Sequence, residues 1–120
     1  MLAVSVPAHS SLMLAAAEKL SEALDETTFL SPRIPVICAV DGIAYGDGDD
    51  IRERIKRQVF SPVRWVATIK GIVNRGASAI IECGPGKVLT GLNRRIERNL
   101  HMASFDSPDV LQEELNGVAE

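Results

Sequence analysis

The stretch Ala79-Ile80-Ile81-Glu82-Cys83-Gly84-Pro85-Gly86-Lys87-Val88-Leu89 decides the fold class of this chain. Four of its first five residues are apolar, a pattern typical of a strand buried on both faces of a parallel sheet. The Gly-Pro-Gly turn ends that strand, and a helix is predicted to follow. Five apolar residues at helical spacing form the predicted inner face of that helix: Val88, Leu89, Leu92, Ile96 and Leu100.

Upstream of this unit the sequence predicts a strand, a helix, a loop and a second strand. The first strand covers residues 4–6 and stops at Pro7. Ser10 or Ser11 is expected to cap the helix, and the run at residues 34–40 reads as another buried strand. The apolar stripe of the helix has spacings of three and four: Leu12, Met13, Ala16, Ala17, Leu20 and Leu24.

The middle and the end of the chain predict further helices. Residues 41–50 read as a surface loop, in which Asp49 or Asp50 caps a helix that Ser61-Pro62 stops. The next helix covers residues 65–73 and is closed by Gly76. A weak strand at residues 103–105 and a final helix at 108–115 complete the order. This alternation predicts an α/β fold with parallel strands, although two convincing strands are too few for a free-standing sheet.

Composition bounds the class of protein. The chain has 120 residues, enough for one domain or part of one, and 46% of them are hydrophobic. A formal net charge of −3 argues against a nucleic-acid partner, because neutralising phosphates needs a basic surface. No run reaches the roughly 18 apolar residues that span a bilayer. Cys38 and Cys83 form neither a disulfide framework nor a metal knuckle, so we expect buried thiols in a cytoplasmic protein.

Two stretches of the sequence resemble ligand-binding motifs but lack residues that those motifs require. The Gly84–Lys87 turn is not a phosphate loop, because Pro85 lacks a donor N–H and Val88 stands where Ser or Thr should meet magnesium. The acidic stretch resembles a calcium loop only loosely, since Ile51 and Arg52 occupy essential positions. We therefore expect no metal and no cofactor, and a solvated loop with a helix cap at the acidic residues: Asp41, Asp47, Asp49, Asp50 and Glu53.

Three landmarks, in order, carry a family resemblance. The first is Val4-Ser5-Val6-Pro7-Ala8-His9-Ser10, the second is Gln58-Val59-Phe60-Ser61-Pro62-Val63-Arg64-Trp65, and the third is Gly84-Pro85-Gly86-Lys87-Val88-Leu89. Together they resemble the C-terminal part of a malonyl-CoA:acyl carrier protein transacylase. The similarity runs from Val4 to about Leu115. Residues 1–120 are thus expected to be the C-terminal part of the acyltransferase domain.

The resemblance implies roles for two residues. His9 is the expected general base, which takes the proton of a serine hydroxyl and returns it to the leaving thiol. Gln58 matches the glutamine whose backbone carbonyl orients that histidine. Without the resemblance, His9 reads more simply as a surface or satisfied core histidine, and Gln58 as a surface glutamine. The implied reaction moves a malonyl group from malonyl-CoA to the phosphopantetheine thiol of acyl carrier protein in fatty-acid synthesis.

The resemblance also implies what this chain does not contain. The implied fold is the C-terminal segment of an α/β-hydrolase-like large subdomain, an incomplete parallel sheet with flanking helices, without the ferredoxin-like insert. No Gly-x-Ser-x-Gly nucleophile elbow occurs in the sequence. We therefore expect the missing N-terminal part of the enzyme as a partner and an inactive isolated chain. Two alternatives stay open: a truncated interaction module without catalysis, and a fragment of a polyketide synthase acyltransferase domain.

A basic helix is the last candidate feature. Its side chains are Lys87, Arg94, Arg95 and Arg98. Such a run is most simply a solvated face. The sharper hypothesis is a docking surface for the acidic acyl carrier protein or for the phosphates of coenzyme A, because opposite charges steer association.

Overall fold

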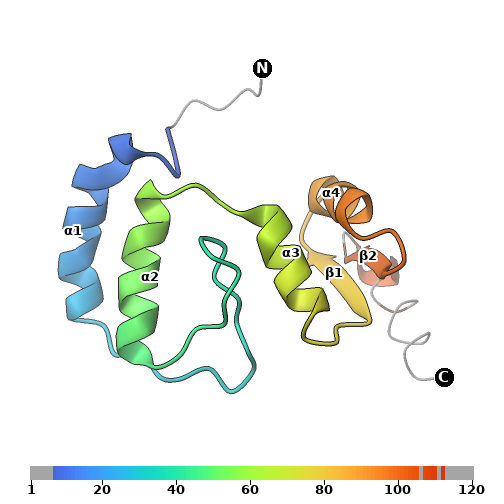
Figure 1. Ribbon diagram of the computed structural model, residues 1–120, viewed down its shortest axis with the longest axis horizontal. Helices are drawn as coiled ribbons and strands as arrows, with labels where there is room; N and C mark the ends of the chain where they lie inside the picture. Colours follow the sequence, from blue (N-terminus) through green and yellow to red (C-terminus); the bar gives the residue numbers. More distant parts are fainter. Residues whose placement is uncertain (1–6, 106, 111, 113–120) are drawn as a thin grey trace. The chain divides into compact units, whose positions relative to one another are not determined.

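The computed structural model describes residues 7–105, 107–110 and 112, and the chain forms two compact units, Met1–Thr68 and Ile69–Glu120. Figure 1 shows the elements in chain order. The strand predicted at residues 4–6 lies outside the described residues. So does half of the helix predicted at 108–115, of which residues 108–110 and 112 are helical. The elements are η1 (Ser11–Met13), α1 (Leu14–Asp25), α2 (Gly48–Phe60), α3 (Trp65–Val73), β1 (Ala79–Cys83), α4 (Val88–Ile96) and β2 (His101–Phe105).

Helices α1 and α2 lie side by side in the first unit (Figure 1). Their buried apolar residues include Ala17 and Leu24 from α1 and Ile51 from α2. Arg52 adds a polar clamp, because its guanidinium donates to the carbonyls of Leu24 at 2.9 Å and Thr27 at 3.2 Å. Carbonyls at a helix C-terminus lack partners within the helix. Arg52 thus completes the end of α1 while it holds the two helices together.

The predicted caps differ from the observed ones. Ser10 stands at the N-cap position of η1, but its hydroxyl donates to the Pro7 carbonyl and caps nothing. Helix α2 begins at Gly48, and Asp47 is its cap, since its carboxylate accepts from the Asp50 N–H at 3.0 Å. The prediction of Asp49 or Asp50 was therefore wrong by two or three residues. Several acidic residues in a row can each satisfy the local cap rule, so the sequence alone does not select one.

The predicted strand at residues 34–40 does not form. The run folds back on itself instead, with one isolated antiparallel bridge between Ile37 and Ala44. Gly42 makes the reversal possible: its φ is +76°, and a Cβ there would lie 3.0 Å from the Ala67 carbonyl oxygen. Cys38 and Val40 are buried, whereas Ile34 is 78% exposed. An apolar run becomes a parallel strand only where neighbouring strands are available, and the described residues offer this one none.

The second unit contains a parallel pair of strands. β1 pairs with β2 in register from Ala79 opposite His101 to Cys83 opposite Phe105. The β1 strand and the expected β2 strand are thus present, but the expected burial of β1 on both faces is wrong, because Ile81 is 37% exposed and Cys83 is exposed. With one neighbour on one side, β1 is an edge strand. Helix α3 covers Trp65–Val73 as predicted, but Gly76, with a φ of +89°, lies three residues beyond its end and is not its C-cap.

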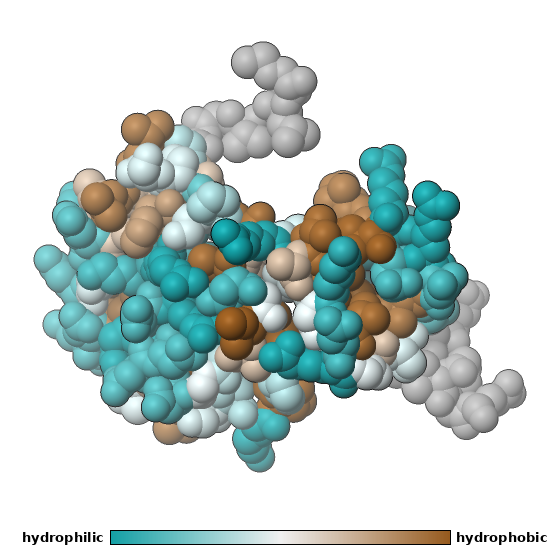
Figure 2. All heavy atoms as spheres, in the orientation of Figure 1, coloured by the Kyte–Doolittle hydropathy of each residue, from teal (hydrophilic) through white to brown (hydrophobic). Residues whose placement is uncertain are grey.

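Helix α4 follows the Gly-Pro-Gly turn as predicted, but it presents a different face to the strands. Thr90 and Asn93 are its buried residues. The expected inner residues are accessible instead: Val88 is 74% exposed, and Leu89 and Leu92 are also exposed. Figure 2 shows apolar atoms, in brown, at the surface around this helix. The polar contacts of Thr90 with β1 and β2, given below, determine which face turns inward.

Candidate active site

Two carbonyl oxygens at the end of α2 hold His9. Its Nδ1 atom lies 2.8 Å from the Gln58 carbonyl oxygen, and its main-chain N–H donates to the Val59 carbonyl at 3.1 Å. Both carbonyls belong to the last turn of α2, where no residue of the helix can reach them. A segment before the first helix is therefore fixed to a residue 49 positions later in the chain.

The contact with Gln58 determines the tautomer of His9. A carbonyl oxygen can only accept a hydrogen bond, so Nδ1 must carry the proton when the imidazole is neutral. The remaining lone pair then lies on Nε2. Because His9 is exposed, a partner group can approach its imidazole ring. An imidazole held in this way can accept a proton at Nε2.

The backbone of His9 is unusual. Its φ is +59°, and His9 is the non-glycine residue with positive φ among the described residues. Such a conformation is uncommon for side chains with a Cβ, although histidine tolerates it better than most. The surrounding contacts must hold it, and here the Val59 carbonyl does so through the His9 N–H. Strained backbone of this kind concentrates at functional sites.

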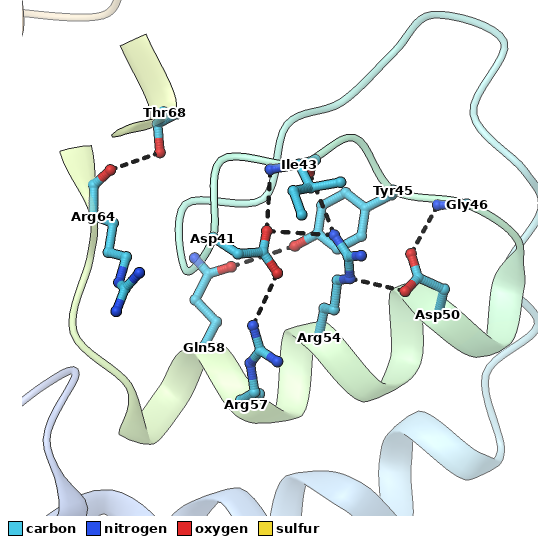
Figure 3. A network of polar contacts seen from close by, with 10 residues as sticks. All are labelled: Asp41, Ile43, Tyr45, Gly46, Asp50, Arg54, Arg57, Gln58, Arg64 and Thr68. Atoms are coloured by element: carbon cyan, nitrogen blue, oxygen red, sulfur yellow. Dashed lines mark hydrogen bonds and ion pairs between the residues drawn. The ribbon is translucent and has the colours of Figure 1, made fainter. Parts of the chain in front are cut away.

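The side chain of Gln58 has its own partner. The Tyr45 hydroxyl donates to Gln58 Oε1 at 3.4 Å, and Figure 3 shows the two side chains meeting above α2. Burial, together with a hydrogen bond to the Cys38 thiol, raises the pKa of the Tyr45 phenol above its ordinary value of 10.0. Tyr45 is therefore a neutral donor at physiological pH. Its ring also lies under Arg54, with 5.9 Å between the guanidinium carbon and the ring centroid.

The carboxylate of Glu82 lies at the N-terminus of α4. The Glu82 carboxylate on β1 accepts hydrogen bonds from Thr90 N–H at 2.7 Å, from the Thr90 hydroxyl at 2.6 Å and from Leu89 N–H at 3.2 Å. Thr90 Oγ1 also lies 3.3 Å from the Ala103 carbonyl oxygen of β2. A carboxylate at a helix N-terminus satisfies free N–H groups and the helix dipole. Glu82 thus occupies the position at this helix N-terminus where a phosphate loop would hold its phosphate.

These hydrogen bonds make the stability of the chain depend on pH. The Thr90 hydroxyl and the Thr90 N–H lower the pKa of Glu82 below its ordinary value. A carboxyl with a lowered pKa stabilises the fold above its unfolded pKa, and this contribution is lost as pH falls through its folded pKa. We expect Glu82→Gln to be less stable than the wild type at pH 7 and the difference to shrink as pH falls below the ordinary range of a glutamate carboxyl.

Urea unfolding of the wild type and Glu82→Gln across this pH range checks the expectation. Thr90→Val removes the hydroxyl that contributes most to the shift, so it should lose part of the same pH dependence. A stability difference that stays constant from pH 7 to the acid limit would contradict the role of the Glu82 charge.

The four basic residues of the predicted docking surface lie in the second unit. Arg94 donates to the Met102 carbonyl of β2 at 3.2 Å, so it has a structural contact. Lys87 stands at the N-cap position of α4. Arg95 and Arg98 are exposed. Arg94 is exposed like Arg95 and Arg98, but it also has this contact with β2.

The remaining candidate residues divide between core and surface. Both cysteines are free thiols; Cys38 is buried as expected, whereas Cys83 is exposed, which corrects the prediction. No cluster of three or more possible metal ligands occurs among the residues that the structure describes. In the same part of the chain, no helix is long and apolar enough to cross a membrane.

Sequence reasoning missed Asp41 and Tyr45. Asp41 was expected in a solvated loop, but its side chain is 22% exposed and pairs with both Arg54 and Arg57. One signal was available: Arg54 and Arg57 are three residues apart on α2, so they present two positive charges on one helix face. The sequence did not indicate which acidic residue would meet them.

Comparisons with known proteins agree with this architecture. No protein-family model matches the chain. The malonyl CoA-acyl carrier protein transacylase of Escherichia coli K12 is 40% identical over 110 residues, which are 92% of this chain and 36% of that protein. The crystal structure of the transacylase of Xanthomonas oryzae pv. oryzae superposes with a TM-score of 0.92 at 37% identity, over 97% of this chain and 37% of that one.

A third similar protein was solved in a complex. It is a malonyl-transacylase bound to a type II polyketide synthase acyl-carrier protein, with a TM-score of 0.93 and 40% identity. The match covers 97% of this chain and 38% of the transacylase. In each comparison, the chain spans little more than a third of the length of the relative that it matches.

The parallel strands, the flanking helices and these superpositions make the chain part of an α/β acyltransferase, which confirms the predicted fold class. Its landmarks and its relatives fix the family more narrowly. The chain corresponds to the C-terminal part of the malonyl-CoA:acyl carrier protein transacylases, as the sequence resemblance predicted.

Proposed function

We propose that this chain supplies the general base of a malonyl-CoA:acyl carrier protein transacylase and not its nucleophile. One observation carries the proposal: the 2.8 Å contact between His9 Nδ1 and the Gln58 carbonyl oxygen. That contact leaves Nε2 as the basic nitrogen, on an exposed ring held by the end of a helix. The similarity to transacylases supports malonyl transfer as the reaction. The sequence contains no Gly-x-Ser-x-Gly, which supports a nucleophile outside this chain.

The proposed chemistry proceeds in two proton transfers. His9 Nε2 takes the proton of a serine hydroxyl, and the serine oxygen attacks the thioester carbon of malonyl-CoA. The C–S bond breaks, His9 gives the proton to the leaving thiolate of coenzyme A, and a malonyl-serine ester remains. The phosphopantetheine thiol of the carrier protein then reverses these steps. The Gln58 carbonyl orients the ring and accepts from Nδ1–H throughout.

The partner that would contribute the serine is the preceding part of the enzyme. Support comes from the large apolar side chains at the surface of this chain, which a stable free-standing protein would cover. Figure 2 shows apolar atoms at the surface of both units. The most exposed are Leu30 at 81%, Leu12 and Ile34 at 78%, and Val88 at 74%.

The second proposed partner is the acyl carrier protein, and the docking residues are Lys87, Arg94, Arg95 and Arg98. The similar transacylase solved with an acyl-carrier protein supports the choice of partner. The exposed Arg95 and Arg98 are best placed to act by charge, because Arg94 already binds the Met102 carbonyl. Malonyl-CoA is the proposed donor. A cytoplasmic setting belongs to the same proposal, and the two free cysteines fit a reducing compartment.

Reconstitution tests the proposed function. The chain is produced together with the N-terminal two thirds of the Escherichia coli transacylase, and malonyl transfer to acyl carrier protein is measured. We expect transfer from the combination and none from either part alone. A stable complex without transfer would favour a non-catalytic interaction module. Faster transfer to a polyketide synthase carrier protein than to the fatty-acid one would favour the polyketide alternative.

A further inference from the structure

Asp41 is the centre of a polar network that joins the loop at residues 41–46 to α2 (Figure 3). Its Oδ2 accepts from Arg57 at 2.9 Å, and its Oδ1 accepts from the Ile43 N–H at 3.1 Å and from Arg54 at 3.4 Å. The Asp41 side chain is only 22% exposed, and that of Arg54 only 18%. The pair of Asp41 with Arg54 is therefore less screened than a surface pair, and the pair with Arg57, whose side chain is 42% exposed, is intermediate.

The network meets α2 next to the residues that hold His9. Arg57 directly precedes Gln58, and Val59 follows, so all three lie in the last turn of α2. Terminal turns of helices fray readily, because their carbonyls lack partners within the helix. The ion pair of Arg57 with Asp41 ties this turn to the loop before α2 and restricts that motion.

Tyr45 extends the network to Gln58 itself. The hydroxyl of Tyr45 contacts the Gln58 side chain, while the Gln58 main chain contacts His9. The loop at residues 41–46 thus reaches two successive residues of the terminal turn, Arg57 and Gln58. Asp50, one to two turns earlier, holds Arg54 at 2.8 Å and the Gly46 N–H at 2.8 Å, but neither Arg57 nor Gln58.

From these contacts we propose that Asp41 is a positioning residue for His9. It acts through Arg57 on the last turn of α2 and thereby holds the Gln58 carbonyl where Nδ1 can donate to it. This inference rests on the proposed function, since positioning matters only if His9 is the base. Its structural part, control of the His9 tautomer, does not depend on catalysis and is measured separately.

The first experiment observes the tautomer directly in the full 120-residue chain. The imidazole nitrogens are followed by ¹⁵N NMR at about pH 9, above the ordinary range of imidazole titration, and His101→Gln assigns the second histidine. We expect His9 in the wild type to be protonated at Nδ1. In Asp41→Asn this single form should give way to a mixture of both tautomers.

Asp50→Asn is the matched control. This variant also removes one negative charge and one ion pair with an arginine of α2, Arg54. It leaves the pair between Asp41 and Arg57 in place. We expect it to keep the wild-type tautomer even if it lowers stability. If Asp41→Asn fails to fold, Arg57→Gln removes the same pair from the other side. An unchanged tautomer in the folded variant, or an equal change in Asp50→Asn, would overturn the inference.

The second experiment separates positioning from function in the reconstituted enzyme. We expect Asp41→Asn to lower kcat about tenfold with little change in KM, within the about 100-fold that a misplacement of 1 Å can cost. A changed tautomer with unchanged transfer, together with an active His9→Ala variant, would overturn the proposed function and leave the structural link intact. An unchanged tautomer would overturn the positioning role, whatever the activity of His9→Ala.

Discussion

Replacement of His9 by alanine is expected to lower kcat for malonyl transfer by about 10²–10⁴-fold in the reconstituted enzyme. The reason is the loss of Nε2, the nitrogen that the Gln58 contact leaves free to accept a proton. Without a base, the serine hydroxyl must lose its proton to water while it attacks the thioester. The change should fall mainly on kcat, because alanine removes a group that acts in the transition state.

Gln58→Ala is the control for this prediction. The role proposed for Gln58 belongs to its main-chain oxygen, which alanine retains, so only the weak contact with the Tyr45 hydroxyl is lost. We expect an effect far smaller than that of His9→Ala. A loss as large in Gln58→Ala would contradict the main-chain assignment. Nearly full activity in His9→Ala would contradict the role of His9 as the base.

Reversal of charge at Arg95 and Arg98 is expected to raise the KM for acyl carrier protein about tenfold at low salt and to leave kcat nearly unchanged. Both residues are exposed, and charges at the rim of an interface act mostly on the rate of association. Salt should reduce the difference between the Glu variants and the wild type, because the Debye length falls to about 8 Å at physiological ionic strength.

A matched variant separates docking from overall charge. Lys19→Glu with Arg33→Glu changes the net charge by the same amount at exposed residues of the other unit. We expect the KM of this variant to stay close to that of the wild type. Equal increases in both double variants would show that net charge acts, and not the surface that carries Arg95 and Arg98. An unchanged KM in Arg95→Glu with Arg98→Glu would exclude the docking surface.

Local signals predicted much of the fold. The Ser61-Pro62 pair predicted the end of α2 at Phe60, because proline disfavours helical geometry in the residue before it. Gly76 marked the turn after α3, because glycine adopts a positive φ without strain. The alternation of strand and helix predicted parallel strands, which β1 and β2 are, but it did not predict that these two pair. These features depend on residues near one another in the sequence.

Burial was predicted less well, because it depends on neighbours that the local pattern does not specify. The run at residues 34–40 folds back and exposes Ile34, and the edge strand β1 leaves Cys83 exposed. The inner face of α4 was also wrong. Thr90 turns inward because Glu82 and the Ala103 carbonyl bind it, and a hydrophobic pattern cannot anticipate polar contacts between separate elements.

The candidate site shows the same division. The juxtaposition of His9 and Gln58 was expected from the resemblance alone; 48 residues separate them, and neither carries a local signal of its own. Asp41 could not be selected, because five acidic residues from Asp41 to Glu53 looked alike in sequence. Only the fold shows which of them meets Arg57. The catalytic role of His9 stays a prediction until the variants are measured.

The most direct test of the central claim is the location of the malonyl group. The reconstituted enzyme is incubated with malonyl-CoA and denatured without carrier protein, and the intact masses of both chains are measured. We predict one malonyl adduct on the N-terminal part and an unchanged mass for residues 1–120. A malonyl adduct on residues 1–120 that survives denaturation would contradict the account, because this chain would then carry its own nucleophile.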